Sequence, residues 1–395
     1  MSPQPTRPGV VLLDPGNYTP YYDLNLAHAL AQRGWPVEVA TSPYLFESLA
    51  PVSGVEVRHY FFRLLDHSWP TRLARRRSIS RARQAYKALA YPAGLLRLAQ
   101  ELERRPAGIL HVQWALLPPL DAWLWRRLRG KGWKVVYTAH EVTPVAAPSP
   151  PLLGRLYRRL PEVSDFVIVH SSSEASALEA HGVPAEQLRR IPQGDLGLFG
   201  RPSLSVESAR ATLGLEPKRP TLLFFGLLKA YKGLDVLLRS LPAVRRAHPD
   251  VLLLVAGEQV DPFPRGSFDL DGSVEWREGY VATEAAARYL AAADVVVLPY
   301  KRSSSSAVLP AAYAHGRPVV ATTLGGLPEM IEPGRTGLLV PPEDEVALAG
   351  ALISLLDDPA ATRAMGERAR RLAAERHAWP DIATRTEAVY EEALE

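Results

Sequence analysis

Short apolar runs rich in β-branched residues alternate with segments of helical periodicity along the first half of the chain. The runs predict strands at Val10–Asp14, Val37–Thr41, Val55–Tyr60, Ile109–Val112, Val135–Thr138, Phe166–His170 and Leu188–Ile191. Between the first two, apolar positions from Leu24 to Ala31 recur at helical spacing, and Gly34 ends that segment. Strand, helix and strand in this order predict a parallel sheet with helices on both faces.

The same alternation restarts after the loop at residues 194–205. Strands are predicted at Thr221–Phe225, Val251–Ala256, Val274–Arg277, Val295–Pro299, Pro318–Thr322 and Thr336–Val340. The pattern therefore predicts two doubly wound, Rossmann-like α/β domains that face each other across a cleft. We assign residues 1–200 to the first domain, 201–375 to the second and 376–395 to a closing helix. Ligands of such sheets bind at the carboxyl ends of the strands.

Composition narrows the chemistry that this chain can perform. It has 395 residues, 47% of them hydrophobic and 22% charged, which fits a globular protein of two domains. It contains no cysteine, which excludes disulfides, iron–sulfur clusters, Cys-ligated zinc and thiolate nucleophiles. We recognise neither a signal peptide nor an apolar run of membrane-spanning length, so we expect a cytoplasmic protein.

Basic residues are concentrated in one segment. Between Arg72 and Arg105 there are ten Lys or Arg against two Glu, a net charge of +8 in a chain whose total is +4. Trp123, Trp125 and Trp133 follow among further arginines. A basic, aromatic surface fits peripheral docking on anionic lipid at the inner face of a membrane. The alternative is a solvated helix face with tryptophans in the core, and we expect no nucleic acid as partner because no recognition module accompanies the charge.

The segment FFGLLKAYKGLDVLL, from Phe224 to Leu238, combines a strand end with two lysines. Gly226 closes the strand, Lys229 and Lys232 follow, and Gly233 opens a helix. Lysines beside the unpaired N–H groups of a helix N-terminus suit a phosphate. The segment is not a P-loop, because GxxxxGK[ST] is absent, and no GxGxxG follows any strand.

A second anion site is predicted within LPYKRSSSSAVLPAAYAHGRPVVATTLGGLPEMIEPGRTGLLVPPED, residues 298–344. A basic, serine-rich loop follows a strand and enters a helix of small residues. The backbone N–H groups of Ser306, Ala307 and Val308, backed by the helix dipole, would hold an anion, although an N-cap serine alone gives the same pattern. Two such sites in one domain indicate a diphosphate.

Together with EWREGYVATEAAARYLAAADVVVLPY and the closing HAWPDIATRTEAVYEEAL, these segments resemble the family 4 glycosyltransferases of the GT-B fold, in their YKG-type subgroup. In the first half, KVVYTAHEV and IPQGD are similar to the acceptor domain of that family. The resemblance implies that a hexose passes from a UDP- or GDP-sugar to a glycan or lipid-linked acceptor, without metal or cofactor and with retention. It also implies that the helix at residues 376–395 packs on the first domain.

The resemblance places Lys232 at the family's phosphate-binding lysine, six residues after Gly226. The usual arginine is replaced by Leu227, and Lys229 would supply the missing charge. The other donor-binding residues that it implies are Tyr280, Ser305, Ser306, Ala307, Val308, Gly325, Gly326 and Glu329. The family's two glutamates, one of which holds the donor ribose, would fall at Ser303 and Ala311, and both are missing. The nucleotide therefore stays open.

On the acceptor side, His140 in TAHEV matches the family's histidine beside the transferred sugar, where an imidazole would hold a hydroxyl or stabilise charge. Glu141 is a candidate carboxylate base, although strand alternation points it elsewhere. The expected acceptor-binding residues are Gly16, Asn17, Tyr18, Tyr21 and Trp114.

For the mechanism, we expect Lys232, Lys229 and helix N–H groups to stabilise the departing diphosphate in place of a metal ion. Attack on the face of the leaving group would retain the anomeric configuration, and an inverting reaction with Glu141 or His140 as base stays open. The missing glutamates favour one alternative, a GT-B pseudoenzyme or partner subunit that binds nucleotide without turnover.

Overall fold

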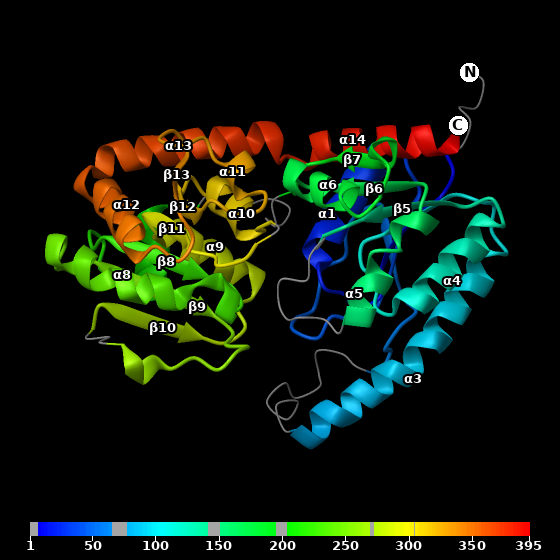
Figure 1. Cartoon of the computed structure of the whole chain (residues 1–395), viewed down its shortest axis with the longest axis horizontal. Coiled ribbons are helices and arrows are strands. Elements are labelled where there is room, and N and C mark those ends of the chain that lie inside the picture. The colour runs from blue at the N-terminus through cyan, green and yellow to red at the C-terminus, as the bar shows by residue number, and fades with distance from the viewer. Residues whose placement is uncertain (1–6, 65–76, 141–150, 195–203, 269–271, 304) are drawn as a thin grey trace.

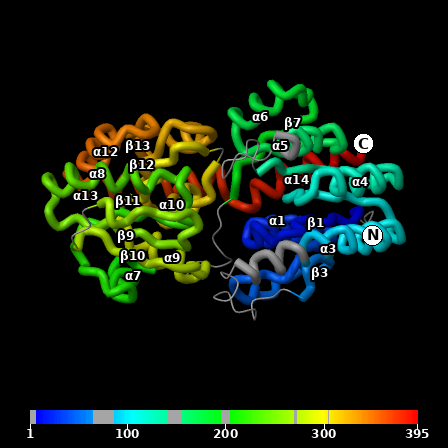
Figure 2. The backbone as a smooth tube through the Cα atoms, turned by 60° about the horizontal axis from the view of Figure 1, so that its bottom comes forward, coloured from blue at the N-terminus to red at the C-terminus, as the bar shows by residue number. Residues whose placement is uncertain are grey.

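The computed structural model describes residues 7–64, 77–140, 151–194, 204–268, 272–303 and 305–395. Two parallel sheets, each covered by helices, form its framework and lie side by side (Figures 1 and 2). The first sheet has seven strands and the second six. The chain therefore has the predicted pair of Rossmann-like units.

The first sheet has the strand order β3-β2-β1-β4-β5-β6-β7, and every neighbouring pair is parallel. Its strands are β1 (Val10–Asp14), β2 (Val37–Thr41), β3 (Val55–His59), β4 (Ile109–Val112), β5 (Lys134–Thr138), β6 (Phe166–Val169) and β7 (Leu188–Arg190). Its helices are α1 (Pro20–Gln32), α3 (Arg77–Leu102), α4 (Pro118–Arg129), α5 (Pro151–Tyr157) and α6 (Ser172–Glu179).

The second sheet has the order β10-β9-β8-β11-β12-β13, again with parallel pairs throughout. Its strands are β8 (Thr221–Phe225), β9 (Leu252–Gly257), β10 (Val274–Glu278), β11 (Val295–Leu298), β12 (Val319–Thr322) and β13 (Gly337–Val340). The helices that follow in the chain are α7 (Val206–Leu213), α8 (Leu234–Ala247), α9 (Thr283–Ala292), α10 (Val308–Ala314), α11 (Leu327–Met330), α12 (Glu345–Asp357), α13 (Pro359–Arg376) and α14 (Trp379–Leu394).

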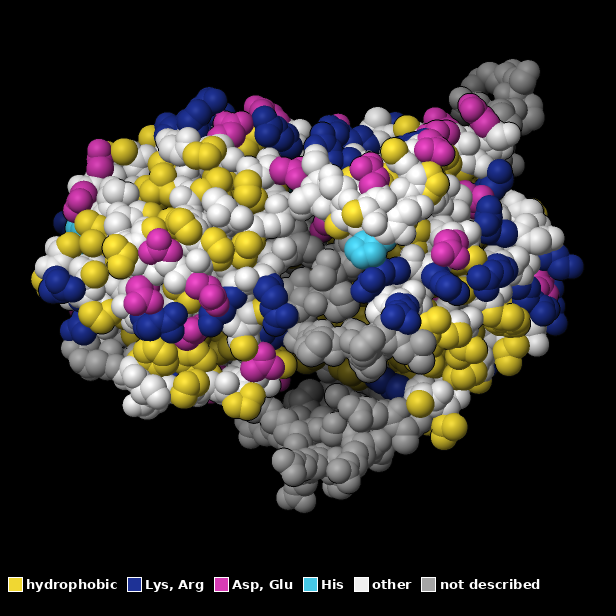
Figure 3. Space-filling model, in the orientation of Figure 1, with side chains coloured by type: hydrophobic (Ala, Val, Ile, Leu, Met, Phe, Trp, Pro, Cys, Tyr) yellow, Lys and Arg dark blue, Asp and Glu magenta, His cyan; other side chains and the backbone are white. Residues whose placement is uncertain are grey.

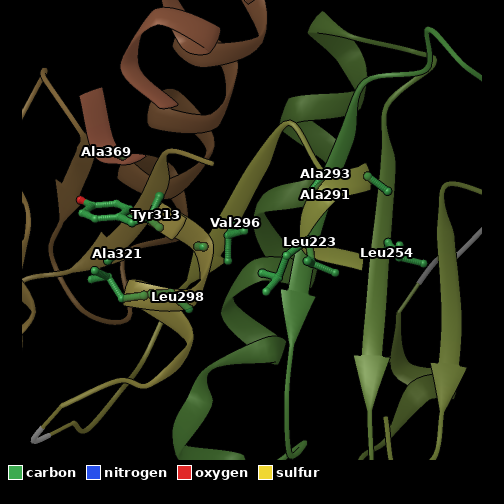
Figure 4. Packing of buried hydrophobic residues seen from close by; sticks show 14 of the residues in the cluster. Leu223, Leu254, Ala291, Ala293, Val296, Leu298, Tyr313, Ala321 and Ala369 are labelled. Carbon is green, nitrogen blue, oxygen red and sulfur yellow. The ribbon is translucent and has the colours of Figure 1, made fainter. Parts of the chain in front are cut away.

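Strand residues alternate between two cores in each domain, as the pleat requires. In the second domain, Leu223 and Leu254 face a core with α7, α9, α10 and α13, whereas Leu222 and Leu253 face one with α8 and α12. Figure 4 shows part of the first of these cores, with Leu223, Leu254 and Val296 on adjacent strands and Tyr313 on α10. Burial on both faces explains why these strands read as continuous apolar runs.

The last helix, α14, packs along α1 of the first domain (Figure 1). Its buried residues in the core of that domain are Ile382, Ala383, Val389, Tyr390 and Ala393. Glu387 accepts a hydrogen bond from the Trp35 indole at 3.3 Å and forms ion pairs with Arg7 and Arg33. The C-terminus thus supplies part of the core around β1.

The tryptophans of the basic region divide between core and surface. Trp125 and Trp133 are buried in the core under α4, whereas Trp123 is 37% exposed. Much of Arg72–Arg105 lies outside the residues whose side chains the structure describes, but Leu89 is 80% exposed and Leu96 48% exposed on α3. Within the described residues, no helix is both long and apolar enough to cross a bilayer.

Candidate active site

The strand orders define where ligands should bind. In the first sheet, the strand order runs outward from β1 on one side and from β4 on the other, so the crossover direction reverses between these two strands. In the second sheet, it reverses between β8 and β11. Ligand sites of doubly wound sheets lie outside the carboxyl ends of the strands at such switch points. The predicted acceptor loop follows β1, and the two predicted anion-binding segments follow β8 and β11. The fold therefore brings each predicted half of the site to a switch point.

Gly226 and Lys232 meet directly after β8. Gly226 has a φ of 103°, and a Cβ placed on it would lie 3.0 Å from Lys232 Nζ. A Cβ here would crowd the ammonium, and glycine adopts this positive-φ backbone conformation readily. Burial lowers the pKa of Lys232 to about 8, with a smaller contribution from the nearby charge of Lys229. A partly buried cation at a strand end is a strong site for an anion.

The second predicted segment borders the same space. A Cβ on Gly226 would also lie 3.8 Å from Val308 Cγ2, and Lys232 Nζ lies 5.9 Å from the ring of Tyr300. The Tyr300 hydroxyl is 3.1 Å from Ser306 Oγ, and Ser306 is buried. The structure thus brings Gly226, Lys232, Ser306 and Val308 together around one point.

The remaining predicted donor residues lie on neighbouring loops. Ser305 accepts a hydrogen bond from Ser303 Oγ at 3.1 Å through its carbonyl, and Ala307 directly precedes α10. Gly325 (φ 54°) and Gly326 form the turn that leads from β12 into α11. These residues, like Lys232, lie at the carboxyl ends of the strands of the second sheet.

Tyr280 reaches across to the first domain. Its hydroxyl donates to Glu47 Oε1 at 2.9 Å, and its ring stacks on Phe46 with 4.6 Å between centroids. Tyr21, a predicted acceptor residue, donates to the same Glu47 oxygen. A residue predicted for the donor and one predicted for the acceptor therefore converge on a single carboxylate.

Glu329 makes a second bridge between the domains. Its two carboxylate oxygens accept hydrogen bonds from the backbone N–H groups of Ser172 and Ser173, at 2.8 and 3.1 Å. These groups are the first of α6, so the carboxylate interacts favourably with the helix dipole. Arg190 Nη1 lies 3.5 Å from the same side chain.

The acceptor loop is wound around Asp14, the last residue of β1. Its carboxylate accepts hydrogen bonds from the N–H groups of Gly16 (3.1 Å), Tyr18 (2.6 Å) and Thr19 (3.1 Å). Asn17 adopts a φ of 52° and donates through its amide to the Ser42 carbonyl at 2.7 Å. These bonds fix the loop that carries the predicted acceptor residues.

Asp14 has a second buried acid beside it. Burial raises the pKa of Asp14 to about 6, although its backbone hydrogen bonds oppose this. Burial also raises the pKa of Asp23 well above the ordinary value, and the charge of Asp14 raises it further. The two carboxyl groups interact electrostatically, and protonation of Asp23 relieves the repulsion between them.

A pocket of about 830 Å³ opens between this loop, α1 and the carboxyl ends of β2 and β3. Its polar lining is Asn17, Asp23, Thr41, Tyr44, Glu47, Ser48, His59 and Arg63. The pocket shares Glu47 with the bridge to Tyr280. It has the size of a small-ligand site.

His140 lies after β5 but presents a face, rather than a nitrogen, to the acceptor loop. Its ring stacks on Trp114 with 5.1 Å between centroids, and Trp114 donates through its indole N–H to Thr19 at 2.9 Å. Both ring nitrogens have partners, Gln113 at 2.9 Å and His170 at 3.1 Å. A hydrogen bond to a sugar hydroxyl would therefore replace one of these contacts. Glu141 lies outside the described residues.

Several residues of this region were not predicted. Glu47 lies on a segment without a predicted motif, whereas Asp23 shares α1 with Tyr21 and Gln113 directly precedes Trp114. The partners of all three come close only when the chain folds. Tyr300, in contrast, lies two residues after β11, at the carboxyl end of a strand where ligands are expected to bind. Its place at a strand's carboxyl end was a signal that sequence inspection could have used.

Comparison with known families agrees with the two halves of the site. Residues 22–194 match the model described as "Glycosyltransferase Family 4", and residues 219–358 match "Glycosyl transferases group 1". A D-inositol 3-phosphate glycosyltransferase of Segniliparus rotundus is 31% identical over 94% of this chain and 84% of its own length. One from Kineococcus radiotolerans is 29% identical, over 95% and 90%.

Solved structures share the fold. The sucrose-phosphate synthase of Thermosynechococcus elongatus superposes with a TM-score of 0.74 and 24% identity, covering 98% of this chain and 99% of its own. HepE of Anabaena, solved in complex with UDP-glucose, gives a TM-score of 0.69 at 18% identity, covering 98% and 100%. Two facing Rossmann-like domains of this kind make up the GT-B fold class. Within that class, the chain belongs to the family 4 glycosyltransferases.

Proposed function

We propose that this enzyme transfers a hexose from a UDP- or GDP-sugar to a hydroxyl group of a glycan or lipid-linked acceptor, without a metal ion and with retention. The contact between Gly226 and Lys232 carries the proposal, because it leaves a desolvated ammonium at the switch point of the second sheet. Support also comes from the UDP-glucose complex of HepE and from the relatives named for a phosphorylated inositol acceptor.

In the proposed reaction, the bond between the anomeric carbon and the diphosphate oxygen breaks as the acceptor oxygen attacks the same face. Lys232 stabilises the charge that develops on the departing diphosphate, and Lys229 adds a second positive charge from the same loop. The acceptor hydroxyl gives up its proton to the departing diphosphate oxygen on the same face as the new bond forms. Retention follows from attack on the face that the leaving group occupies.

We assign the acceptor to the pocket of about 830 Å³ in the first domain. Asn17 and Asp23 offer polar groups for hydroxyls, and Arg63 lines the same pocket as a cation. Tyr18 and Trp114, whose rings meet edge to face at 5.5 Å, stand on the adjoining loops. Aromatic faces of this kind suit the apolar face of a sugar.

We further propose that the first domain docks on an anionic membrane surface through α3. Leu89 and Leu96 are exposed on this helix, Arg97 and Arg104 line a pocket beside it, and Figure 3 shows Lys and Arg side chains next to hydrophobic ones on the first domain. Co-sedimentation with vesicles that contain anionic lipid tests this. Binding at low salt that depends on anionic lipid is expected, and equal recovery with neutral vesicles would refute it.

The alternative, a nucleotide-binding protein without turnover, is favoured by Ser303 and Ala311, which replace the family's glutamates. Thermal unfolding with UDP, GDP, ADP, dTDP and their sugars tests the donor site. A ligand at about 100 times its Kd adds about 2.7 kcal/mol to stability. We expect one base to stabilise the wild type and the exposed-site control Lys218→Ala, but not Lys232→Ala. The absence of any shift would contradict the proposed donor site.

A further inference from the structure

A continuous line of buried polar groups crosses the first sheet from α14 to the end of β6. The Tyr390 hydroxyl lies 2.6 Å from His111 Nδ1, and His111 Nε2 lies 3.1 Å from Gln113 Nε2. Gln113 Oε1 lies 2.9 Å from His140 Nε2, and His140 Nδ1 lies 3.1 Å from His170 Nε2. At the end of the line, His170 Nδ1 lies 3.0 Å from the Ile191 carbonyl oxygen. Every side chain in this line is at most 9% exposed. His111 Nε2 also lies 2.7 Å from Thr138 Oγ1.

The carbonyl of Ile191 sets the direction of the line, because a carbonyl only accepts. His170 must carry its proton on Nδ1, 3.0 Å from that oxygen. Burial lowers the pKa of His170 to about 4, so the ring is neutral at pH 7 and its Nε2 accepts. His140 then donates through Nδ1, and its own Nε2 becomes an acceptor.

Gln113 completes the line through an amide that can face either way. With its oxygen toward His140 Nε2, that nitrogen must donate, and the pair formed by His140 and His170 must then carry a positive charge. A half-turn of the amide exchanges its oxygen and nitrogen at nearly the same positions. Gln113 then donates to His140 and accepts from His111 Nε2, and all the rings are neutral. Burial favours this arrangement, since it lowers the pKa of His140 well below its ordinary value and that of His170 to about 4.

The ring held in this way supports the wall of the acceptor site. His140 stacks on Trp114 at an interplanar angle of 14°, and Tyr22 packs edge-on against it, with 4.9 Å between centroids. Trp114 contacts Tyr18 and bonds to Thr19 in the acceptor loop. A change in the hydrogen bonding of His140 would therefore tilt or release Trp114.

We propose that Gln113 and His170 are positioning residues, which fix His140 as the tautomer protonated on Nδ1 and thereby hold Trp114 in place for the acceptor. Only the consequence for the acceptor rests on the proposed function. The tautomer itself is a property of the folded chain.

The imidazole nitrogen chemical shifts of His140, measured by NMR at pH 7, test the proposal without an activity assay. We expect a neutral ring protonated on Nδ1 in the wild type. Gln113→Glu introduces an acceptor-only carboxylate and should convert His140 into the doubly protonated form. His170→Leu removes the acceptor for Nδ1 and should shift the population toward the Nε2 tautomer. Gln32→Glu, the same change at an exposed position of α1, should leave His140 as in the wild type.

Protonation of His140 on Nε2 in the wild type would overturn the proposal, as would an unchanged tautomer in both variants. Unaltered signals of the exposed His181 on the same domain confirm that a variant is folded. Given an active enzyme, Gln113→Glu should raise the KM for the acceptor about tenfold and that for the donor by less than about twofold. A fold-wide defect would change both. A wild type with the expected tautomer and no turnover would refute the proposed function alone.

Discussion

At the scale of single residues, the proposed donor site depends most on Lys232. Its ammonium lies against Gly226 in a position that a side chain at residue 226 would occupy, and burial lowers its pKa to about 8. An ordinary lysine has a pKa of about 10.4 and stays charged throughout the range in which proteins are handled. The affinity of the donor site should therefore carry a pH dependence that only this residue explains.

We predict that the affinity for the matching nucleoside diphosphate falls as the pH rises above 8. Free Lys232 loses its proton there, and binding then requires proton uptake, so Kd rises by up to about tenfold per pH unit. Lys232→Arg keeps its charge and should give a flat profile between pH 7 and 9.5. Titration calorimetry at several pH values measures this. Parallel profiles for both proteins would contradict the role of Lys232.

A second residue-scale prediction concerns Glu174, a buried carboxyl that caps α6. Burial raises its pKa to about 7, above the unfolded value, so ionisation costs the native state stability above about pH 5. At pH 8 the cost is roughly 3 kcal/mol. Glu174→Gln should therefore gain stability relative to the wild type between pH 5 and 8, measured by urea unfolding. An advantage that does not grow with pH would rule this out.

The sequence motif places Gly226 and Lys232 six residues apart on one loop, and the structure brings them into contact. Glu47, Asp23 and His170 could not be found in this way. Glu47 and His170 depend on partners that lie tens to hundreds of residues away, Tyr280 and His140. Asp23 depends on Asp14, which the fold of the intervening loop brings close. A local pattern does not specify such pairs.

At the scale of elements, the strands were predicted to within one residue at each end. Strands buried on both faces have strongly apolar sequences, and glycine follows or closes several of them. The division of the tryptophans was harder. Trp123 and Trp125 both lie on α4, yet Trp123 is exposed and Trp125 is buried. Residues two positions apart on a helix point toward opposite sides of it.

The helix α14 gives the prediction that belongs to this scale. Ile382 is fully buried against α1 and the first sheet, although it lies near the C-terminus. Ile382→Ala should lower the free energy of unfolding by about 2–5 kcal/mol. Leu394→Ala, at a 38% exposed site of the same helix, should cost far less. Urea unfolding followed by tryptophan fluorescence compares them, and equal small losses would show that α14 is not part of this core.

At the scale of the whole molecule, two carboxylates bridge the domains, one from each domain. Glu47 of the first domain binds Tyr280 of the second, and Glu329 of the second binds the start of α6 in the first. Both bridges involve residues predicted for substrate binding. Domain closure and substrate binding therefore use overlapping groups.

We predict that Glu47→Ala together with Glu329→Ala favours a more open arrangement, because both bridges are lost while neither domain core changes. Small-angle X-ray scattering should show a larger radius of gyration than in the wild type. Glu216→Ala and Glu284→Ala serve as controls, because both side chains are exposed and, among the contacts described above, neither joins the two domains. A radius unchanged by the double substitution would show that other contacts set the domain arrangement.

We propose above all that this chain transfers a sugar from a nucleotide donor by means of Lys232. The most direct measurement is the release of nucleoside diphosphate from UDP- and GDP-hexoses in the presence of a pool of glycan and lipid-linked acceptors. We predict acceptor-dependent release with one nucleotide class, reduced by at least about 100-fold in Lys232→Ala and unchanged in Lys218→Ala. Nucleotide binding without release, or equal release by Lys232→Ala and the wild type, would contradict the account.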